Sequence, residues 1–203
     1  KKMANNFFNK IVKNVSADSN TPSEVYAVPA SKKTIVIELD VANRSTSSQT
    51  IDVEIEDFSE KGSAVTLSNG TSVSSNTLTS GTAHNLTTGD RIQFTHVTGL
   101  SGVATAKQYW VIKVAATTFK VASSHTNASA GTALTVTGTQ AAANSLNSLA
   151  FVYVVRAAPI PIGGALKVIA GQKLVLEAQD KLYCTASAAS SVDAIASILE
   201  DVS

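Results

Sequence analysis

The sequence predicts an all-β fold: an antiparallel β-sandwich or jelly-roll-like body that carries a smaller, inserted all-β domain. Apolar and polar residues alternate over short runs, with the period of two that is typical of half-buried strands. Clusters of Gly, Pro, Ser, Asn and Asp separate these runs, as turns do. Charge density also changes abruptly, because residues 64–148 contain only five charged side chains and the other 118 residues contain 26. A chain of 203 residues can form two modest domains, so we predict that this change marks an insertion.

These signals divide the chain into three parts. We predict an N-terminal arm over residues 1–19, a sandwich body over 20–63 and 149–203, and an inserted module over 64–148. In the arm, "NNFFNKIVKNV" places Phe8, Ile11, Val12 and Val15 on one face of a possible helix. Its asparagines and short length suit an extended segment equally, so both conformations stay open.

Two alternating runs open the body. In "KTIVIELDVAN" and "TIDVEIEDF" the apolar residues share one face and the acidic residues the other. The apolar set is Ile35, Ile37, Leu39 and Val41 in the first run and Ile51, Val53 and Ile55 in the second. Five polar residues, 44–48, join the runs, a length that suits a hairpin.

Such a hairpin places Asp52 opposite Asp40, and Glu54 opposite Glu38, on the outward face. Like charges directly opposite each other destabilise a sheet. Three explanations are compatible with the pattern: a solvated and screened face, a cation between the carboxylates, or a basic patch on a partner. These four acidic residues are therefore candidate partner contacts.

After the insert, five further strands are predicted, over residues 149–157, 165–170, 173–178, 181–187 and 192–200. Pro159 and Pro161 lack a backbone N–H, so their segment should run along a sheet edge or cross between sheets. Gly163 and Gly164 then permit a sharp turn. Cys184, the single cysteine, lies in an alternating run and is predicted to be a core residue.

The insert contains a predicted turn at residues 88–90, then a strand with Ile92 and Phe94 pointing inward. Two further strands flank a turn at residues 115–117. His84, His96 and His125 all fall in the insert, and none shows the close spacing of metal ligands. We expect them to be exposed loop or strand histidines.

We predict no catalytic, cofactor-binding or metal-ligating residues. No Gly-x-Ser-x-Gly elbow and no phosphate-binding glycine motif occurs in the sequence. The net charge of +1 offers no field that would attract nucleic acid, and no apolar run approaches the roughly 20 residues of a membrane span. Trp110 with Lys107, Lys113 and Lys120 could form a basic aromatic strip for nucleic acid, but a core tryptophan flanked by lysines is the preferred alternative.

Three stretches of the body carry a resemblance. Residues 25–29 (VYAVP), 158–161 (APIP) and 174–178 (LVLEA) resemble a family of small virion structural proteins of tailed bacteriophages. The likeness covers nearly all of the body, and "AHNLTTGDRIQF" and "YWVIKVAATTFKVASS" in the insert are similar to β modules of phage tail and fibre proteins. One departure is Gln179 before Asp180, where the family usually has Gly-Asp. It predicts a turn that tolerates a negative φ, or a turn led by the aspartate.

The resemblance implies a virion component: a capsid decoration or cement protein that binds across major capsid subunits, forms homo-oligomers, and is made in the host cytoplasm before joining the particle surface. A tail, neck or baseplate component is one alternative. A receptor- or glycan-binding module is another, in which His84, Tyr109 and Trp110 would be exposed contacts of the insert. In the arm, Phe7, Phe8 and Ile11 are candidates for an anchor on the partner, or they pack on the chain's own sandwich.

Overall fold

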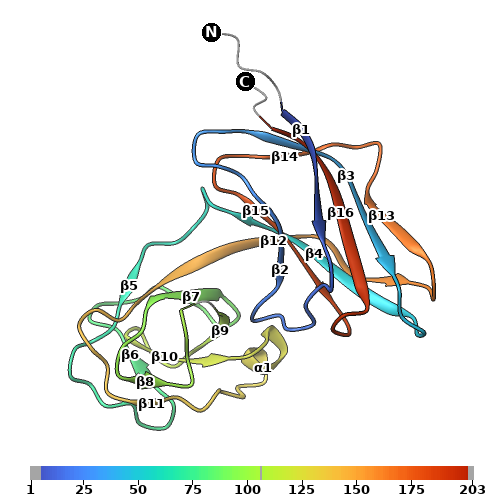
Figure 1. Ribbon diagram of the computed structural model, residues 1–203. Helices are drawn as coiled ribbons and strands as arrows, with labels where there is room; N and C mark the ends of the chain where they lie inside the picture. The colour runs from blue at the N-terminus through green and yellow to red at the C-terminus, as the bar shows by residue number, and fades with distance from the viewer. Residues whose placement is uncertain (1–5, 106, 201–203) are drawn as a thin grey trace. The chain divides into compact units, whose positions relative to one another are not determined.

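The computed structural model describes residues 6–105 and 107–200 (Figure 1). Over these residues the chain is all-β with antiparallel pairing, which confirms the predicted fold class. The one helix found there is α1 (His125–Ser129). The strands are β1 (Asn6–Val12), β2 (Ser23–Ala27), β3 (Thr34–Asn43), β4 (Gln49–Asp57), β5 (Val65–Thr66), β6 (Leu78–Thr79), β7 (Arg91–His96), β8 (Leu100–Ser101), β9 (Gln108–Lys113), β10 (Thr118–Ala122), β11 (Thr137–Gly138), β12 (Ser145–Ile160), β13 (Ala165–Ile169), β14 (Leu174–Leu176), β15 (Lys181–Ala186) and β16 (Val192–Glu200).

The chain forms two compact units, which we call the body and the insert. The body comprises Lys1–Asp18, Pro22–Ser59 and Phe151–Ser203, and the insert comprises Ser19–Thr21 and Glu60–Ala150. Each unit has a hydrophobic core of its own.

The body is a sandwich of two sheets. The first sheet has the order β1-β16-β3-β13, with β14 also paired to β3, and Figure 1 shows β1, β16, β3 and β13 side by side. The second runs β2-β15-β4-β12. One cluster of buried side chains takes Leu39 from the first sheet and Val53 from the second, both fully buried. The core therefore lies between the two sheets.

The predicted hairpin of β3 and β4 is wrong. β3 pairs with β16, β13 and β14, whereas β4 pairs with β15, so the two strands belong to different sheets. The connection between them crosses the sandwich, and the Asn43 side chain holds it by donating to the carbonyls of Ser47 (2.7 Å) and Ile160 (3.1 Å). A connector of five polar residues suits either path, and alternation does not distinguish them.

A bulge in β3 also changes which residues face the core. Ser197 of β16 lies opposite Glu38 and Ile198 lies opposite Val36, so Ile37 is the extra residue. Val36 is fully buried, whereas Ile35 is only half-buried. The prediction that Ile35 shares the face of Leu39 is therefore wrong, because the bulge reverses the alternation N-terminal to it.

The N-terminal segment is a strand. β1 pairs with β16 without a register shift, from Asn6 opposite Glu200 to Val12 opposite Ala194. The extended alternative is confirmed for the described residues 6–12, and the helical one is wrong.

Glu200, at the end of β16, fastens this strand to the opposite sheet. Its carboxylate accepts hydrogen bonds from Lys32 Nζ (2.8 Å) and Tyr26 Oη (2.5 Å). The bond from Lys32, and then that from Tyr26, lowers the pKa of the Glu200 carboxyl. Burial, followed by the bond to Glu200, raises the pKa of Tyr26 to about 12.

The five predicted strands after the insert correspond to β12 to β16. Gly163 adopts φ +64 in the turn after the prolines, as predicted. Cys184 is buried. Gln179 has φ +70, so the prediction of a negative φ is wrong. The aspartate does not lead the turn but closes it, because the Asp180 N–H donates to the Glu177 carbonyl (3.2 Å). The Asp180 carboxylate accepts hydrogen bonds from the backbone N–H of Glu177 (2.8 Å) and Phe58 (3.0 Å).

Within the insert, the strand order is β12-β7-β9-β10-β6, with β5 paired to β12. Ile92 and Phe94 point into its core, and β9 and β10 form the predicted hairpin, with Lys113 opposite Phe119. The short helix α1 was not predicted. Ser124 is its N-cap, and the Ser124 side chain accepts a hydrogen bond from the N–H of Asn127 (3.1 Å).

Candidate interaction surface

The outward face of the first sheet is the candidate site. Along β1 the side chains alternate, so Phe8 and Val12 pack on the core while Phe7 and Ile11 point away from it, each 62% exposed. In β16 the inward residues include Ala194 and Ala196, both fully buried. We call the opposite side of this sheet the outer face.

An apolar row crosses the outer face at one end. Phe7 lies opposite Leu199, Leu199 opposite Ile35, and Ile35 opposite Val175, so one side chain from each of β1, β16, β3 and β14 forms the row. Directly opposed residues of an antiparallel sheet lie about 5 Å apart at Cβ. Phe7 and Val175, at its two ends, are 62% and 59% exposed. We call these four residues the apolar row.

A second row is mixed. Ile11 lies opposite Ile195, Ile195 opposite Asp40, and Asp40 opposite Lys167. Lys167 bridges two carboxylates: its ammonium donates to Glu38 and lies 4.0 Å from Asp40 Oδ2. The bond to Glu38, then the charges of Asp40 and Glu38, raise the pKa of Lys167. Lys167 of the same sheet thus offsets part of the negative charge of Glu38 and Asp40.

Four of the seven predicted partner contacts come together on this face: Phe7, Ile11, Glu38 and Asp40. The other three do not. Phe8 packs inward, its ring centroid 6.0 Å from that of Tyr26.

Asp52 and Glu54 belong to the second sheet, opposite Thr185 and Tyr183. Asp52 accepts a hydrogen bond from the Ala157 N–H (2.6 Å), and Glu54 is buried. The predicted pairing of like charges, Asp52 with Asp40 and Glu54 with Glu38, is therefore wrong, because the two strands lie in different sheets.

Sequence reasoning missed four members of the outer face: Ile35, Ile195, Leu199 and Val175. A signal existed in β16. Its sequence VDAIASILE is apolar at both alternating sets of positions, a pattern typical of a strand covered on both faces.

The predicted exposed contacts of the insert are buried, which corrects that prediction: His84, Tyr109 and Trp110 are only 5%, 3% and 4% exposed. The Tyr109 hydroxyl accepts a hydrogen bond from the Ala104 N–H (2.9 Å). The Trp110 ring packs with Ala128 of α1, and the Arg91 guanidinium lies 4.9 Å from its centroid. Helix α1 therefore covers the face of β9 that carries Trp110. Without this helix, which was not predicted, that face would be exposed.

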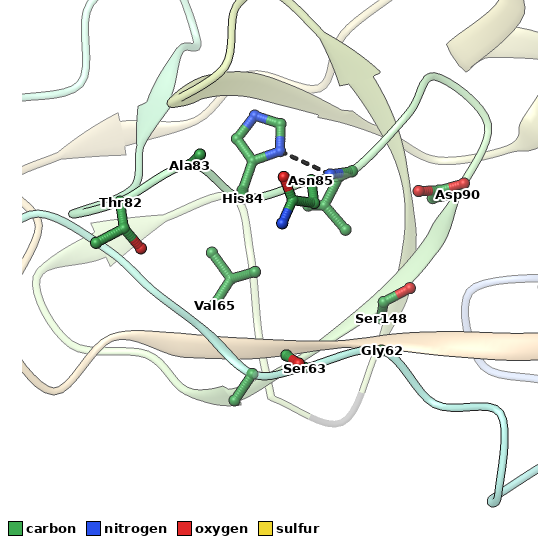
Figure 2. Close-up of a pocket in the computed structure, with 11 residues that line it drawn as sticks. Gly62, Ser63, Val65, Thr82, Ala83, His84, Asn85, Asp90 and Ser148 are labelled. Atoms are coloured by element: carbon green, nitrogen blue, oxygen red, sulfur yellow. Dashed lines mark hydrogen bonds between the residues drawn. The ribbon is translucent and has the colours of Figure 1, made fainter.

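His84 borders a cavity of about 190 Å³ within the insert (Figure 2). Its Nδ1 accepts a hydrogen bond from the Leu86 N–H (3.0 Å), drawn dashed in Figure 2, and its Nε2 lies 3.0 Å from the Ala115 carbonyl. This pattern assigns the proton to Nε2. Asp90, on the same wall, accepts hydrogen bonds from the Thr87 N–H and hydroxyl, both at 2.7 Å. These side chains stabilise the loop 84–90 and are already engaged with it.

Over residues 6–105 and 107–200, no three His, Cys, Asp or Glu side chains are grouped so that they could hold a metal ion. In the same part of the chain, no helix is long and apolar enough to span a bilayer. No protein-family model matches the sequence, and no curated protein matches it significantly.

Proposed function

We propose that this protein is a non-enzymatic structural component of a tailed-bacteriophage virion, a capsid decoration or cement protein that binds neighbouring capsid subunits through the outer face of the body. The resemblance of the body sequence to virion structural proteins supplies the class of protein. The observation that carries the proposal is the apolar row, with Phe7 and Val175 exposed and Ile35 and Leu199 half-buried, on a sheet whose other side packs on the core of the body. Contiguous exposed apolar side chains mark interaction sites.

The chemistry of the outer face suits docking. The apolar row at one end of the face contains no charged residue, and beside it Lys167 offsets part of the charge of Glu38 and Asp40. The apolar row is built on paired strands, which fixes its shape before binding. A rigid face loses little conformational freedom on association. The polar groups around the cavity of the insert are, by contrast, bonded to their own loop.

The first experiment measures copy number. A stained gel of purified virions should show the protein at a level comparable with the major capsid protein, because a decoration protein repeats with the capsid lattice. A level of only a few copies per particle would assign it to the tail, neck or baseplate instead.

The second experiment tests the surface with two matched valines. Val175 on the outer face and Val152 on β12 of the second sheet are 59% and 61% exposed. Val175→Lys should weaken binding of the full chain to capsids about tenfold, because it places an unpaired charge in an apolar contact, which must then be desolvated. Val152→Lys should bind like the unmodified protein. Equal binding by both variants would exclude the outer face as the docking surface.

A further inference from the structure

We infer that two copies of this protein associate through β1, which pairs antiparallel with β1 of the second copy about a two-fold axis at Asn9. This inference deepens the proposed function and rests on it for the role of the dimer. Its geometry comes from the edge of the first sheet alone.

β1 is an edge strand that is ready to pair. It lies at the end of the first sheet, and over the described residues its ladder is formed with β16 only. The ladder has seven consecutive pairs without a register shift, and β1 contains no Gly or Pro. A regular edge strand of this kind presents a row of backbone N–H and C=O groups that a further strand can bind.

The side chains of β1 select one register. With Asn9 opposite Asn9 of the second copy, Phe7 of each copy lies opposite Ile11 of the other on the outer face. These two side chains are 62% exposed in the single chain. Cross-strand aromatic and β-branched pairs stabilise antiparallel sheets. The symmetry makes both contacts identical, as an isologous interface requires.

Charge excludes the neighbouring register. A two-fold axis at Lys10 would place the two Lys10 side chains directly opposite each other, which is destabilising. The axis at Asn9 instead places Lys10 opposite Phe8 of the second copy. Within its own chain Lys10 Nζ already lies over aromatic rings, 5.4 Å from the Phe8 centroid and 5.8 Å from that of Tyr26. The ammonium is therefore held back over the core side and does not block the free edge.

The dimer would enlarge the docking surface. Pairing of the two edges leaves the outer faces of both copies on the same side of one continuous sheet. The Phe7 and Ile11 pairs would then extend each apolar row onto Ile11 and Ile195 of the other copy, because Ile11 lies opposite Ile195 in its own sheet. A seven-residue edge buries less than the roughly 800 Å² per partner of a standard interface, so we expect a dissociation constant in the micromolar range.

Cysteine cross-linking tests the contact and its register. Cys184 is 1% exposed and burial raises its pKa to about 12, so it should not react. In the full-length chain at about 100 µM, Asn9→Cys should give a disulfide-linked dimer on mild oxidation. Val175→Cys, also exposed but on β14 at the opposite edge of the sheet, should stay monomeric.

The register is read from mixtures. Phe7→Cys mixed with Ile11→Cys should cross-link, whereas either variant alone should not, because identical positions would lie about 14 Å apart along the strands. An Asn9→Cys and Ile11→Cys mixture that links better than Asn9→Cys alone would overturn the register. Failure of every pair to link, with a monomer in sedimentation at the same concentration, would overturn the dimer. Because these measurements use purified protein, and capsid binding is measured with Val175→Lys, failure of the dimer and failure of the proposed function are distinguishable.

Discussion

Replacing Gln179 with glycine should stabilise the body. Gln179 has φ +70 in the turn that joins β14 to β15. The left-handed region costs a residue with a Cβ about 1–2 kcal/mol. Glycine removes that cost, but it also loses about 0.5–1 kcal/mol more conformational entropy on folding. The hydrogen bond from the Gln179 N–H to the Val28 carbonyl (3.1 Å) is unchanged by the substitution. The net gain in free energy of unfolding is therefore about 0.5–1 kcal/mol.

The assay is urea unfolding at equilibrium, supported by a thermal melt in which Gln179→Gly should raise the melting temperature by about 1–4 °C. Gln179→Ala keeps the left-handed cost and should show no gain. Gly163→Ala is the converse control, because it adds a Cβ at a residue with a positive φ (+64) where that Cβ would meet nothing within 4 Å. It should lose about 1 kcal/mol through conformation alone. A destabilised Gln179→Gly variant would mean that position 179 does not adopt a positive φ.

Two other substitutions test the body and the insert separately. The hydrogen bond from Lys32 lowers the pKa of Glu200. At a pH above the ordinary glutamate pKa, the ionised Glu200 therefore stabilises the fold, and this stabilisation is lost as the pH falls through the lowered pKa. Urea midpoints of Glu200→Gln should therefore fall less steeply on acidification than those of the unmodified protein; parallel curves would refute the assignment. In the insert, Gly102→Ala should cost about 3 kcal/mol or more, because the new Cβ would lie 2.0 Å from the Thr135 carbonyl oxygen at φ +92. Gly70→Ala, at φ +71 with open space around it, should cost only about 1 kcal/mol by the same thermal assay, and equal losses would contradict the close approach at Gly102.

Periodicity predicted where the strands lie but not which strands pair. β15, β16 and the β9–β10 hairpin were all expected close to their observed positions, because alternation and turn residues are local signals. The pairing of β3 with β16 joins residues about 155 positions apart, such as Asp40 and Ile195, and no local pattern encodes it. The bulge at Ile37 could not be predicted from the sequence either, since an inserted apolar residue cannot be distinguished from the other members of an apolar run.

Only part of the candidate surface could be predicted, because strand pairing also decides which side chains face outward. Phe7 and Ile11 were expected as contacts because exposed apolar residues on a flexible arm gain most by ordering on a partner. Ile35 and Leu199 were assigned to strands without their outward orientation, which depends on the bulge and on the partner strands. Trp110 was misplaced because helix α1, which packs on it, was not predicted; residues 125–129 are too short to show a helical period. Tyr109 belongs instead to the main core of the insert, and alternation along β9 did not show that both faces of this strand are covered.

The position of β16 has a consequence for biosynthesis. It lies between β1 and β3 in the first sheet, although Asn6 leaves the ribosome nearly the whole chain before its partner Glu200. Until β16 emerges, β1 has no partner in this sheet and β3 can pair only with β13 and β14. Nearly all of the insert, by contrast, is contiguous in sequence and can fold during translation. The sheet that carries the outer face should therefore close last, in one late and cooperative step.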